Sequence, residues 1–186
     1  MESLKLLALS GSLRKYSYNT SALEALKILA PSHIEITIGE IGDLPLFNPD
    51  RENENIPALT KLKSSLSEAS GLIIASPEYA HGISGPLKNA LDWLVSGVEF
   101  PYIPIMLINT SPRASHAQNA LKEVLATMSG ILVEKSCLSI PLLSSGLDSI
   151  EITKHEEMAK TLTVGLNNFH EEIAVKKLNK LLHRTC

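Results

Sequence analysis

The chain has 186 residues, of which 44% are hydrophobic and 20% are charged. This length suits one domain with a substantial core, and the composition excludes the disordered and collagen-like classes. The formal net charge is -3, and the Lys and Arg residues are scattered along the chain. We therefore expect no nucleic-acid partner, because no basic footprint for a phosphate backbone is present.

The beginning of the chain and its cysteines bear on the cellular compartment. The first apolar run is too short for the core of a signal peptide, and no stretch approaches the roughly 20 apolar residues that span a bilayer. We therefore expect a cytoplasmic protein without a membrane partner. The cysteines are Cys137 and Cys186, and we expect both to be reduced and structural, with no metal site.

In the first half of the chain, short apolar runs alternate with segments of helical periodicity. The pattern predicts strands at 4–9, 34–38 and 72–75, and helices at 19–30, from about Pro57, and at 87–94. The stretch 43–57 is rich in Pro, Asn, Asp and Glu, which predicts a long surface connection.

The second half continues the alternation. It predicts a strand at 102–108, a polar turn at 111–115, a helix at 117–128, a strand at 131–133 and one or two closing helices over 152–183. No linker or repeat divides the chain, so we expect residues 1–186 to form a single domain. Five strands alternating with helices predict an α/β fold, a doubly wound three-layer α/β/α sandwich around a parallel sheet. Ligands bind such sheets at the carboxyl ends of the strands, which directs attention to the loops after the first, third and fourth strands.

The loop after the first strand is dense in groups that bind phosphate. It reads Ser10-Gly11-Ser12-Leu13-Arg14-Lys15-Tyr16-Ser17-Tyr18-Asn19 and leads into a helix. A helix N-terminus favours anions, and hydroxyl, amide and guanidinium groups add donors. The alternative is that Ser and Asn only cap the helix, although a cap needs one such residue. The loop lacks the patterns of a nucleoside-triphosphate P-loop and of a dinucleotide site.

The loop after the third strand suits a flat heteroaromatic ligand. It runs from Ser76 through Pro77-Glu78-Tyr79-Ala80-His81 to Gly85-Pro86. Its glycines and prolines favour an extended backbone that a ring can approach closely, and Tyr79 offers an aromatic surface. The alternative is an ordinary connection, but this loop is near ten residues, whereas most such loops have about two to six. A lone loop histidine is most often solvated, so His81 is not counted as catalytic.

Together these loops resemble those of the NADPH-dependent FMN reductases. The resemblance rests on Ser10-Gly11-Ser12-Leu13-Arg14 with Ser17 and Asn19, on Pro77-Glu78-Tyr79, and on Gly85-Pro86-Leu87-Lys88-Asn89-Ala90-Leu91-Asp92-Trp93, and it covers about residues 3–135. It implies a flavodoxin-like fold with a five-stranded parallel sheet in the order 2-1-3-4-5, and an oxidoreductase that binds FMN.

The resemblance also implies roles for individual residues. Ser12, Arg14, Ser17 and Asn19 would hold the FMN phosphate, with Ser10 at the edge of the cradle. Pro77, Glu78, Tyr79 and Ala80 would line the isoalloxazine ring, and Ser111 would contact the ring or the ribityl chain. Two positions depart from the family pattern: Ala80 stands where relatives often carry Asn, and the turn at 111–115 is not rich in glycine.

The activity implied by the resemblance is a two-electron transfer. NADPH, or NADH, would pass a hydride to flavin N5, and a small acceptor would then take two electrons. The acceptor could be a quinone, a free flavin, an azo or nitro compound, or a metal oxyanion, and no catalytic side chain is required. A homodimer or homotetramer is also implied, for which 87–98, Phe100 and Tyr102 offer apolar surface, unless these residues simply pack on the sheet.

Two alternatives from other classes remain open. A flavodoxin-type electron carrier would share the fold and FMN, although such a carrier is expected to have a more acidic surface. A flavin-free binding module on the same fold would show an eroded phosphate cradle.

Overall fold

A computed structural model describes the backbone of residues 3–111, 113 and 115–182. The helices are α1 (Tyr18–Leu29), α2 (Pro57–Glu68), α3 (Gly85–Leu94), α4 (Ser115–Thr127), α5 (Ser149–Lys154) and α6 (Glu156–Leu182), with short 3-10 turns η1 (Pro49–Arg51) and η2 (Glu134–Ser136). The strands are β1 (Leu4–Ser10), β2 (Ile34–Gly39), β3 (Gly71–Ala75), β4 (Glu78–Tyr79), β5 (Gly82–Ile83), β6 (Pro104–Asn109), β7 (Ile131–Leu132) and β8 (Leu138–Ser139).

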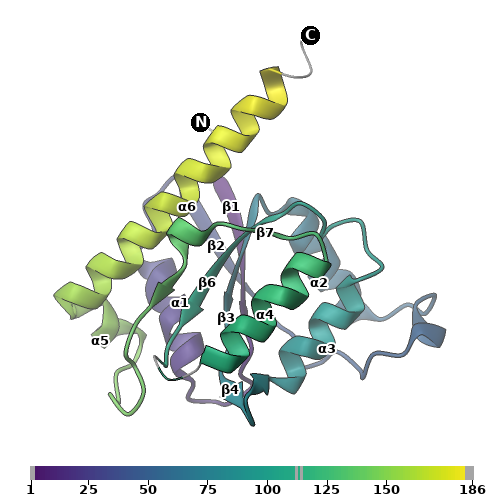
Figure 1. Cartoon of the computed structure of the whole chain (residues 1–186), viewed down its shortest axis with the longest axis horizontal. Helices are drawn as coiled ribbons and strands as arrows, with labels where there is room; N and C mark the ends of the chain where they lie inside the picture. Colours follow the sequence, from purple (N-terminus) through teal and green to yellow (C-terminus); the bar gives the residue numbers. More distant parts are fainter. Residues whose placement is uncertain (1–2, 112, 114, 183–186) are drawn as a thin grey trace.

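The main sheet is parallel and has the order β2-β1-β3-β6-β7. This confirms the predicted order 2-1-3-4-5 and the three-layer sandwich, which is visible in Figure 1 with helices on both faces of the sheet. The register pairs Leu6 of β1 with Ile36 of β2 and with Gly71 of β3. Each crossover helix therefore returns the chain to the same end of the sheet, and all the βα loops gather at the carboxyl ends of the strands.

The fifth position of the sheet differs from the single strand predicted at 131–133. Two short strands share it: β7 pairs with the start of β6 and β8 with its end. Between them, the amide and the hydroxyl of Ser136 both donate to the carbonyl of Val133, at 2.9 and 2.7 Å. These bonds close the turn η2, so the edge strand is interrupted before it resumes.

One face of the sheet is covered by α1, α5 and α6. Leu23 and Leu26 of α1 and Phe169 of α6 are fully buried against sheet residues such as Ile73. The closing helix α6 is longer than this contact requires, and its last turns extend past the body of the molecule (Figure 1). It is held to the sheet by a buried stripe that repeats every three or four residues, which is the spacing of one helix face; the stripe consists of Leu162, Leu166, Phe169 and Ile173.

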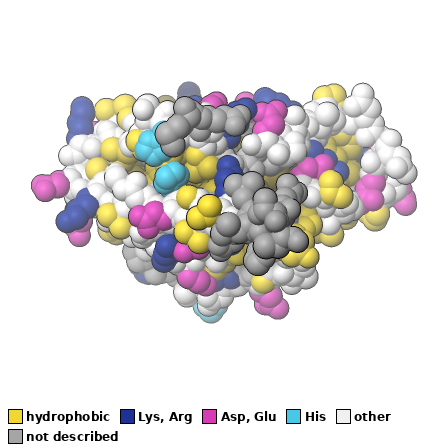
Figure 2. Space-filling model, turned by 90° about the horizontal axis from the view of Figure 1, so that it is seen from above, with side chains coloured by type: hydrophobic (Ala, Val, Ile, Leu, Met, Phe, Trp, Pro, Cys, Tyr) yellow, Lys and Arg dark blue, Asp and Glu magenta, His cyan; other side chains and the backbone are white. Residues whose placement is uncertain are grey.

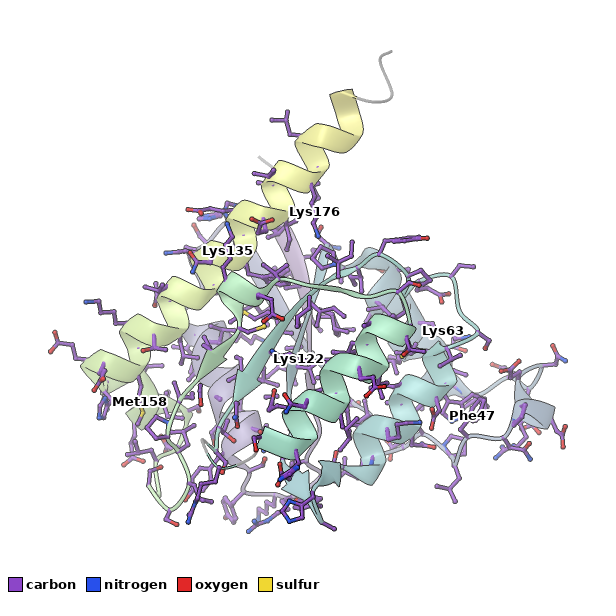
Figure 3. The ribbon with its side chains drawn as sticks, in the orientation of Figure 1. Phe47, Lys63, Lys122, Lys135, Met158 and Lys176 are labelled. Carbon is purple, nitrogen blue, oxygen red and sulfur yellow. The ribbon has the colours of Figure 1, made fainter. Side chains whose placement is uncertain are left out.

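The opposite face is covered by α2, α3 and α4, and it also anchors the long connection at 43–56. The ring of Phe47, labelled in Figure 3, packs edge-on against Trp93 with centroids 5.1 Å apart. The Trp93 indole N–H and the Asn89 amide both donate to the carbonyl of Pro45, and Asn89 Oδ1 accepts from the Phe47 amide. Asn89 and Trp93 of the third-loop motif therefore hold a surface loop in place.

The segment between α3 and β6 exposes only part of the apolar surface that was expected there. Phe100 is 1% exposed, and Leu87, Leu91 and Leu94 of α3 are at most 1% exposed. For these residues the alternative that they pack on the sheet is confirmed. Val98 and Tyr102 are 88% and 74% exposed. Tyr102 has φ of 65°, outside the strand region, and β6 therefore begins at Pro104 rather than at 102.

Figure 2 shows the molecule from above the view of Figure 1, on the side where β1 begins. Among the side chains described there, positive and negative groups are interspersed with apolar ones rather than gathered by sign. None of the helices described is both long enough and apolar enough to cross a bilayer.

A hairpin that the sequence did not predict follows β3. Strands β4 and β5 pair antiparallel through Glu78 with Ile83 and Tyr79 with Gly82. The two residues between them, Ala80 and His81, both have positive φ, at 49° and 59°. This is the backbone of a tight two-residue turn, which usually contains Asn or Gly, and that missing signal explains why the segment looked like an irregular extended loop.

Candidate functional site

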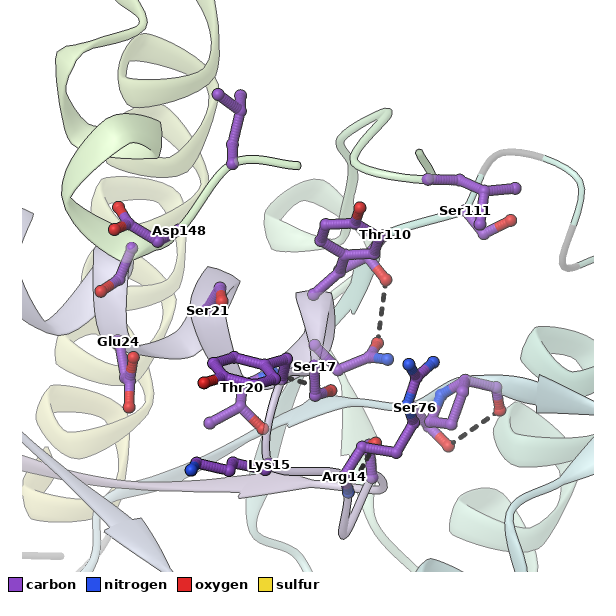
Figure 4. A pocket seen from close by; sticks show the side chains of 18 of the residues that line it. Arg14, Lys15, Ser17, Thr20, Ser21, Glu24, Ser76, Thr110, Ser111 and Asp148 are labelled. Atoms are coloured by element: carbon purple, nitrogen blue, oxygen red, sulfur yellow. Dashed lines mark hydrogen bonds between the residues drawn. The ribbon is translucent and has the colours of Figure 1, made fainter. Parts of the chain in front are cut away.

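A cavity of about 770 Å³ opens at the carboxyl ends of the strands. Figure 4 shows that its walls come from the loop after β1, the first turns of α1, the ends of β3 and β6, and the segment before α5. Its lining includes eight of the ten residues predicted for cofactor binding: Ser12, Arg14, Ser17, Asn19, Pro77, Glu78, Tyr79 and Ser111. Ser10 and Ala80 are not among the lining residues.

The polar loop at the start of α1 caps this helix, and it also presents hydrogen-bond donors to the cavity. Ser17 is the N-cap of α1, and its Oγ accepts from the Thr20 amide at 3.4 Å. The capping alternative therefore holds for Ser17. It does not account for Ser12 or Arg14, which also face the cavity. Asn19 is 5% exposed, and its Oδ1 accepts from the Thr110 hydroxyl at 3.0 Å, which joins the loop to the end of β6.

Ser10 and Gly11 stabilise this loop through hydrogen bonds to neighbouring elements. The Ser10 hydroxyl lies 2.8 Å from that of Thr20. The Gly11 amide donates to the carbonyl of Ala75, and the Gly11 carbonyl accepts from the Ser84 hydroxyl at 2.6 Å. These bonds join the loops after β1 and β3, so the phosphate-binding candidates and the ring-binding candidates form one unit.

The wall formed by Pro77, Glu78 and Tyr79 is tied to helix α4. Glu78 Oε2 accepts from the backbone N–H of Ala117 at 2.9 Å, which caps the first turn of α4. This hydrogen bond is the largest cause that holds the pKa of the Glu78 carboxyl below its usual range. Burial, the next largest, opposes it, and His116 and His81 add smaller lowering effects. The carboxylate thus has a structural task, and Tyr79, half exposed, presents the flat surface.

The turn after β6 lies at the edge of the cavity. Ser111 is partly buried, and its amide donates to the Asn109 side chain at 2.9 Å. Arg113 also lines the cavity, whereas residues 112 and 114 of the predicted turn lie outside the described part of the chain.

The segment before α5 supplies a wall that sequence reasoning missed. Its lining residues are Leu143, Gly146, Leu147, Asp148 and Ser149. The Gly146 amide donates to the Tyr18 hydroxyl at 3.0 Å, and this bond holds the segment against α1. The one available signal was its position after the last strand, where a loop must emerge at the carboxyl edge of the sheet.

Charged side chains of both signs line the cavity. Arg14 and Lys15 come from the loop after β1 and Arg113 from the loop after β6, while Glu24 and Asp148 come from α1 and the N-cap of α5. Figure 4 shows Glu24 and Asp148 on one side of the Ser17 region and Arg14 on the other. Within the described residues, no three His, Cys, Asp or Glu side chains gather as a metal site.

Curated proteins with related sequences are reductases. A 2-hydroxy-1,4-benzoquinone reductase from a Burkholderia species is 40% identical over 90 residues, which are 48% of this chain and 49% of that protein. The chain thus spans about half the length of this relative. A quinone reductase of Escherichia coli is 31% identical over 142 residues, which are 72% of this chain and 76% of that protein.

The fold is also found in a solved flavoenzyme. FerB, an NAD(P)H:(acceptor) oxidoreductase from Paracoccus denitrificans, superposes with a TM-score of 0.76 at 26% identity and covers 92% of this chain and 97% of its own. The model of the family described as NADPH-dependent FMN reductase matches residues 4–142. Because that match contains both loop motifs and every strand of the sheet, the chain belongs to the NADPH-dependent FMN reductase family.

Proposed function

We propose that this chain is one FMN-binding domain that passes two electrons from NADPH or NADH, through bound FMN, to a small acceptor. The observation that carries the proposal is the cavity itself, in which a polar loop at a helix N-terminus and the wall formed by Pro77, Glu78 and the half-exposed Tyr79 face one space. Its volume of about 770 Å³ lies within the range of cofactor sites.

The residues present fit FMN at both of its ends. Ser12, Ser17 and Arg14 would hold the phosphate, because hydroxyl and guanidinium donors beside a helix N-terminus stabilise an anion. Pro77 and Tyr79 would lie along the ring. FMN, when bound, supplies the two-electron chemistry, and the task of the chain is to bind it, orient it and leave one side open to substrates.

Among the acceptors considered, a quinone fits this site best. The relatives from Burkholderia and Escherichia coli are quinone reductases by name. In this chain Tyr79 is 50% exposed and Leu143 is 46% exposed at the cavity, which provides apolar contact for a second ring. Free flavins, azo or nitro compounds and metal oxyanions are the other acceptors that we propose to test.

The visible spectrum of the purified protein tests this function. With FMN added if the preparation is colourless, bound flavin bands should bleach under anaerobic NADPH and return when a benzoquinone is supplied. As a control, Arg51→Gln, on η1 and outside the cavity lining, should leave FMN uptake unchanged. Flavin that binds but is not reduced by either nucleotide would favour an electron carrier, and no flavin uptake would favour a flavin-free binding module.

We further propose a homodimer. Val95, Val98 and Tyr102 are 60%, 88% and 74% exposed, and they follow one another between α3 and β6. Light scattering should give twice the chain mass of 20.2 kDa, and Val98→Asp should return the mass of one chain. A native protein of single-chain mass would contradict the dimer, and a larger assembly would point to the homotetramer instead.

A further inference from the structure

The cavity continues past the phosphate-binding loop, along helix α1. Ser17, Ser21 and Glu24 all line it, and residues at this spacing lie on one face of a helix. From Ser17 to Glu24 the helix rises about 10 Å, which is close to the length of a nucleoside. Because FMN ends at its phosphate, an FMN molecule whose phosphate lies at the start of α1 leaves this part of the cavity open.

The segment before α5 forms the opposite side of this open part, which we call the α1–α5 end of the cavity. Leu147, Asp148 and Ser149 line the same cavity as Glu24. Leu147 and Tyr18 are partly buried against the core, and the bond from the Gly146 amide to the Tyr18 hydroxyl holds the two sides together. The α1–α5 end therefore offers both apolar and polar contacts.

Two carboxylates determine which ligands suit the α1–α5 end. Glu24 is exposed, and no other described residue forms a hydrogen bond or an ion pair with its carboxylate. Asp148 uses Oδ1 to cap α5, by accepting from the Glu151 amide at 2.8 Å, and its other oxygen takes no part in that cap. Carboxylates repel anions but accept hydrogen bonds from hydroxyls, and they bind the ribose hydroxyls of dinucleotides in this way. A neutral ribose fits here, whereas a further phosphate does not.

Lys15 stands between the phosphate-binding loop and these carboxylates. It follows Arg14 in the loop and lines the cavity, and in Figure 4 its side chain extends toward the side where Glu24 lies. Its Nζ is 5.6 Å from the centre of the Tyr16 ring, which also lines the cavity and is 79% exposed. An ammonium group in this place suits a second phosphate next to the first, and an exposed aromatic ring suits a nucleobase.

We propose that the α1–α5 end of the cavity binds the adenylate half of FAD, so that the chain takes up FAD as well as FMN; this rests on the flavin site proposed above. The second phosphate of FAD would meet Lys15. Its ribose hydroxyls would donate to Glu24 and Asp148, and its adenine would lie against Tyr16. The flavin ring and the first phosphate keep the same places as in FMN.

Titration of the flavin-free protein with FMN and with FAD tests the site. FAD should bind, and in Glu24→Ala/Lys15→Gln the dissociation constant for FAD divided by that for FMN should rise about tenfold over the native value, since two charge-assisted contacts to the adenylate half are lost. The matched control Glu123→Ala/Lys177→Gln changes the same residue types at exposed positions outside the cavity lining and should keep the native ratio.

The outcomes separate this site from the reductase function. FAD that fails to bind, or a ratio that is unchanged in Glu24→Ala/Lys15→Gln, would overturn the FAD proposal, while uptake of FMN would leave the reductase function intact. A protein that binds neither flavin would contradict both.

Amide hydrogen exchange locates the adenylate half without a variant. At Ser21–Glu24, exchange should be about threefold slower with saturating FAD than with saturating FMN, because only FAD reaches this part of α1. At Pro77–Tyr79, where both flavins place the same ring, the two rates should be equal. Equal rates at Ser21–Glu24 as well would mean that the adenylate half remains in solvent, and would refute the site.

Discussion

At the scale of single residues, Gly11 allows the loops after β1 and β3 to approach each other closely. A Cβ at this position would lie 2.5 Å from Ser76 Oγ and 2.9 Å from Ser84 Oγ. Gly11→Ala should therefore separate the loops after β1 and β3, lower the stability by about 1–3 kcal/mol, as overpacking does, and weaken FMN binding. Urea unfolding and a flavin titration measure the two effects.

The control for this change is Gly85→Ala, because no atom lies within 4 Å of the Cβ that it would add. That variant should keep the FMN affinity of the native protein. If Gly11→Ala bound FMN as tightly as Gly85→Ala, the close approach of the two loops would have no part in forming the cavity.

Glu78 links stability to pH. Because the Ala117 amide and the neighbouring histidines lower its pKa in the folded protein, its carboxylate contributes stability above the ordinary glutamate pKa of about 4.3. That contribution is lost as the pH falls through the lower pKa of the folded state. Glu78→Gln keeps an oxygen acceptor but loses the charge, so the stability gap between native protein and variant should narrow from pH 7 to pH 3.

Urea unfolding at several pH values measures this gap. Glu35→Gln, at an exposed position on β2, serves as the control and should show a smaller change with pH. A gap for Glu78→Gln that stays constant over the same range would mean that the carboxylate gains nothing from α4.

At the scale of elements, the hairpin β4–β5 carries local backbone strain. Ala80 has φ of 49°, a left-handed conformation that costs a residue with a Cβ about 1 kcal/mol relative to glycine. Ala80→Gly should therefore stabilise the protein by up to about 1 kcal/mol, and Ala80→Asn should also be tolerated, because Asn adopts the left-handed conformation more readily than most residues. Thermal unfolding measures both.

In a helix, the same Ala→Gly substitution should change the stability in the opposite direction. Ala126 is exposed in α4, and Ala126→Gly should destabilise the protein by about 0.5–1 kcal/mol. Loss of stability in both variants would show that the turn at Ala80 is not strained.

The elements also show where sequence patterns succeed and where they fail. Helix α1 was predicted nearly to the residue because Ser17 caps it and its apolar residues repeat at helical spacing. The hairpin was missed because Ala80 and His81 adopt a turn that the surrounding contacts impose, not one that their own preferences favour. The break between β7 and β8 was missed for a similar reason, since it depends on the bonds of Ser136 to Val133.

Some parts of the candidate site could likewise be predicted from the sequence, and others could not. The polar loop after β1 and the wall at Pro77 could be located because each follows a strand that the apolar pattern marks. The roles of Asn89 and Trp93 could not be read from the motif, because their partner Pro45 lies more than forty residues away in the sequence. The wall at 143–149 depends on where the last strand ends and on the bond to Tyr18.

At the scale of the whole molecule, the cavity joins segments that lie far apart in the sequence, from Ser12 to Ser149. It takes residues from the loops after β1, β3 and β6, from α1 and from the segment before α5. A ligand that contacts all of them stabilises the folded state as a unit. FMN at a hundred times its dissociation constant should therefore raise the free energy of unfolding by about 2.7 kcal/mol.

Amide hydrogen exchange shows whether this stabilisation is shared. With FMN, exchange should slow together at Ser12–Asn19, at Pro77–Tyr79 and at Gly146–Ser149. The end of α6, which extends past the body (Figure 1), should keep its rate. Riboflavin, which lacks the phosphate, should give a smaller thermal shift and leave the Ser12–Asn19 segment unprotected. Protection by FMN at Pro77–Tyr79 alone would mean that the polar loop does not receive the phosphate, and equal shifts for the two flavins would mean the same.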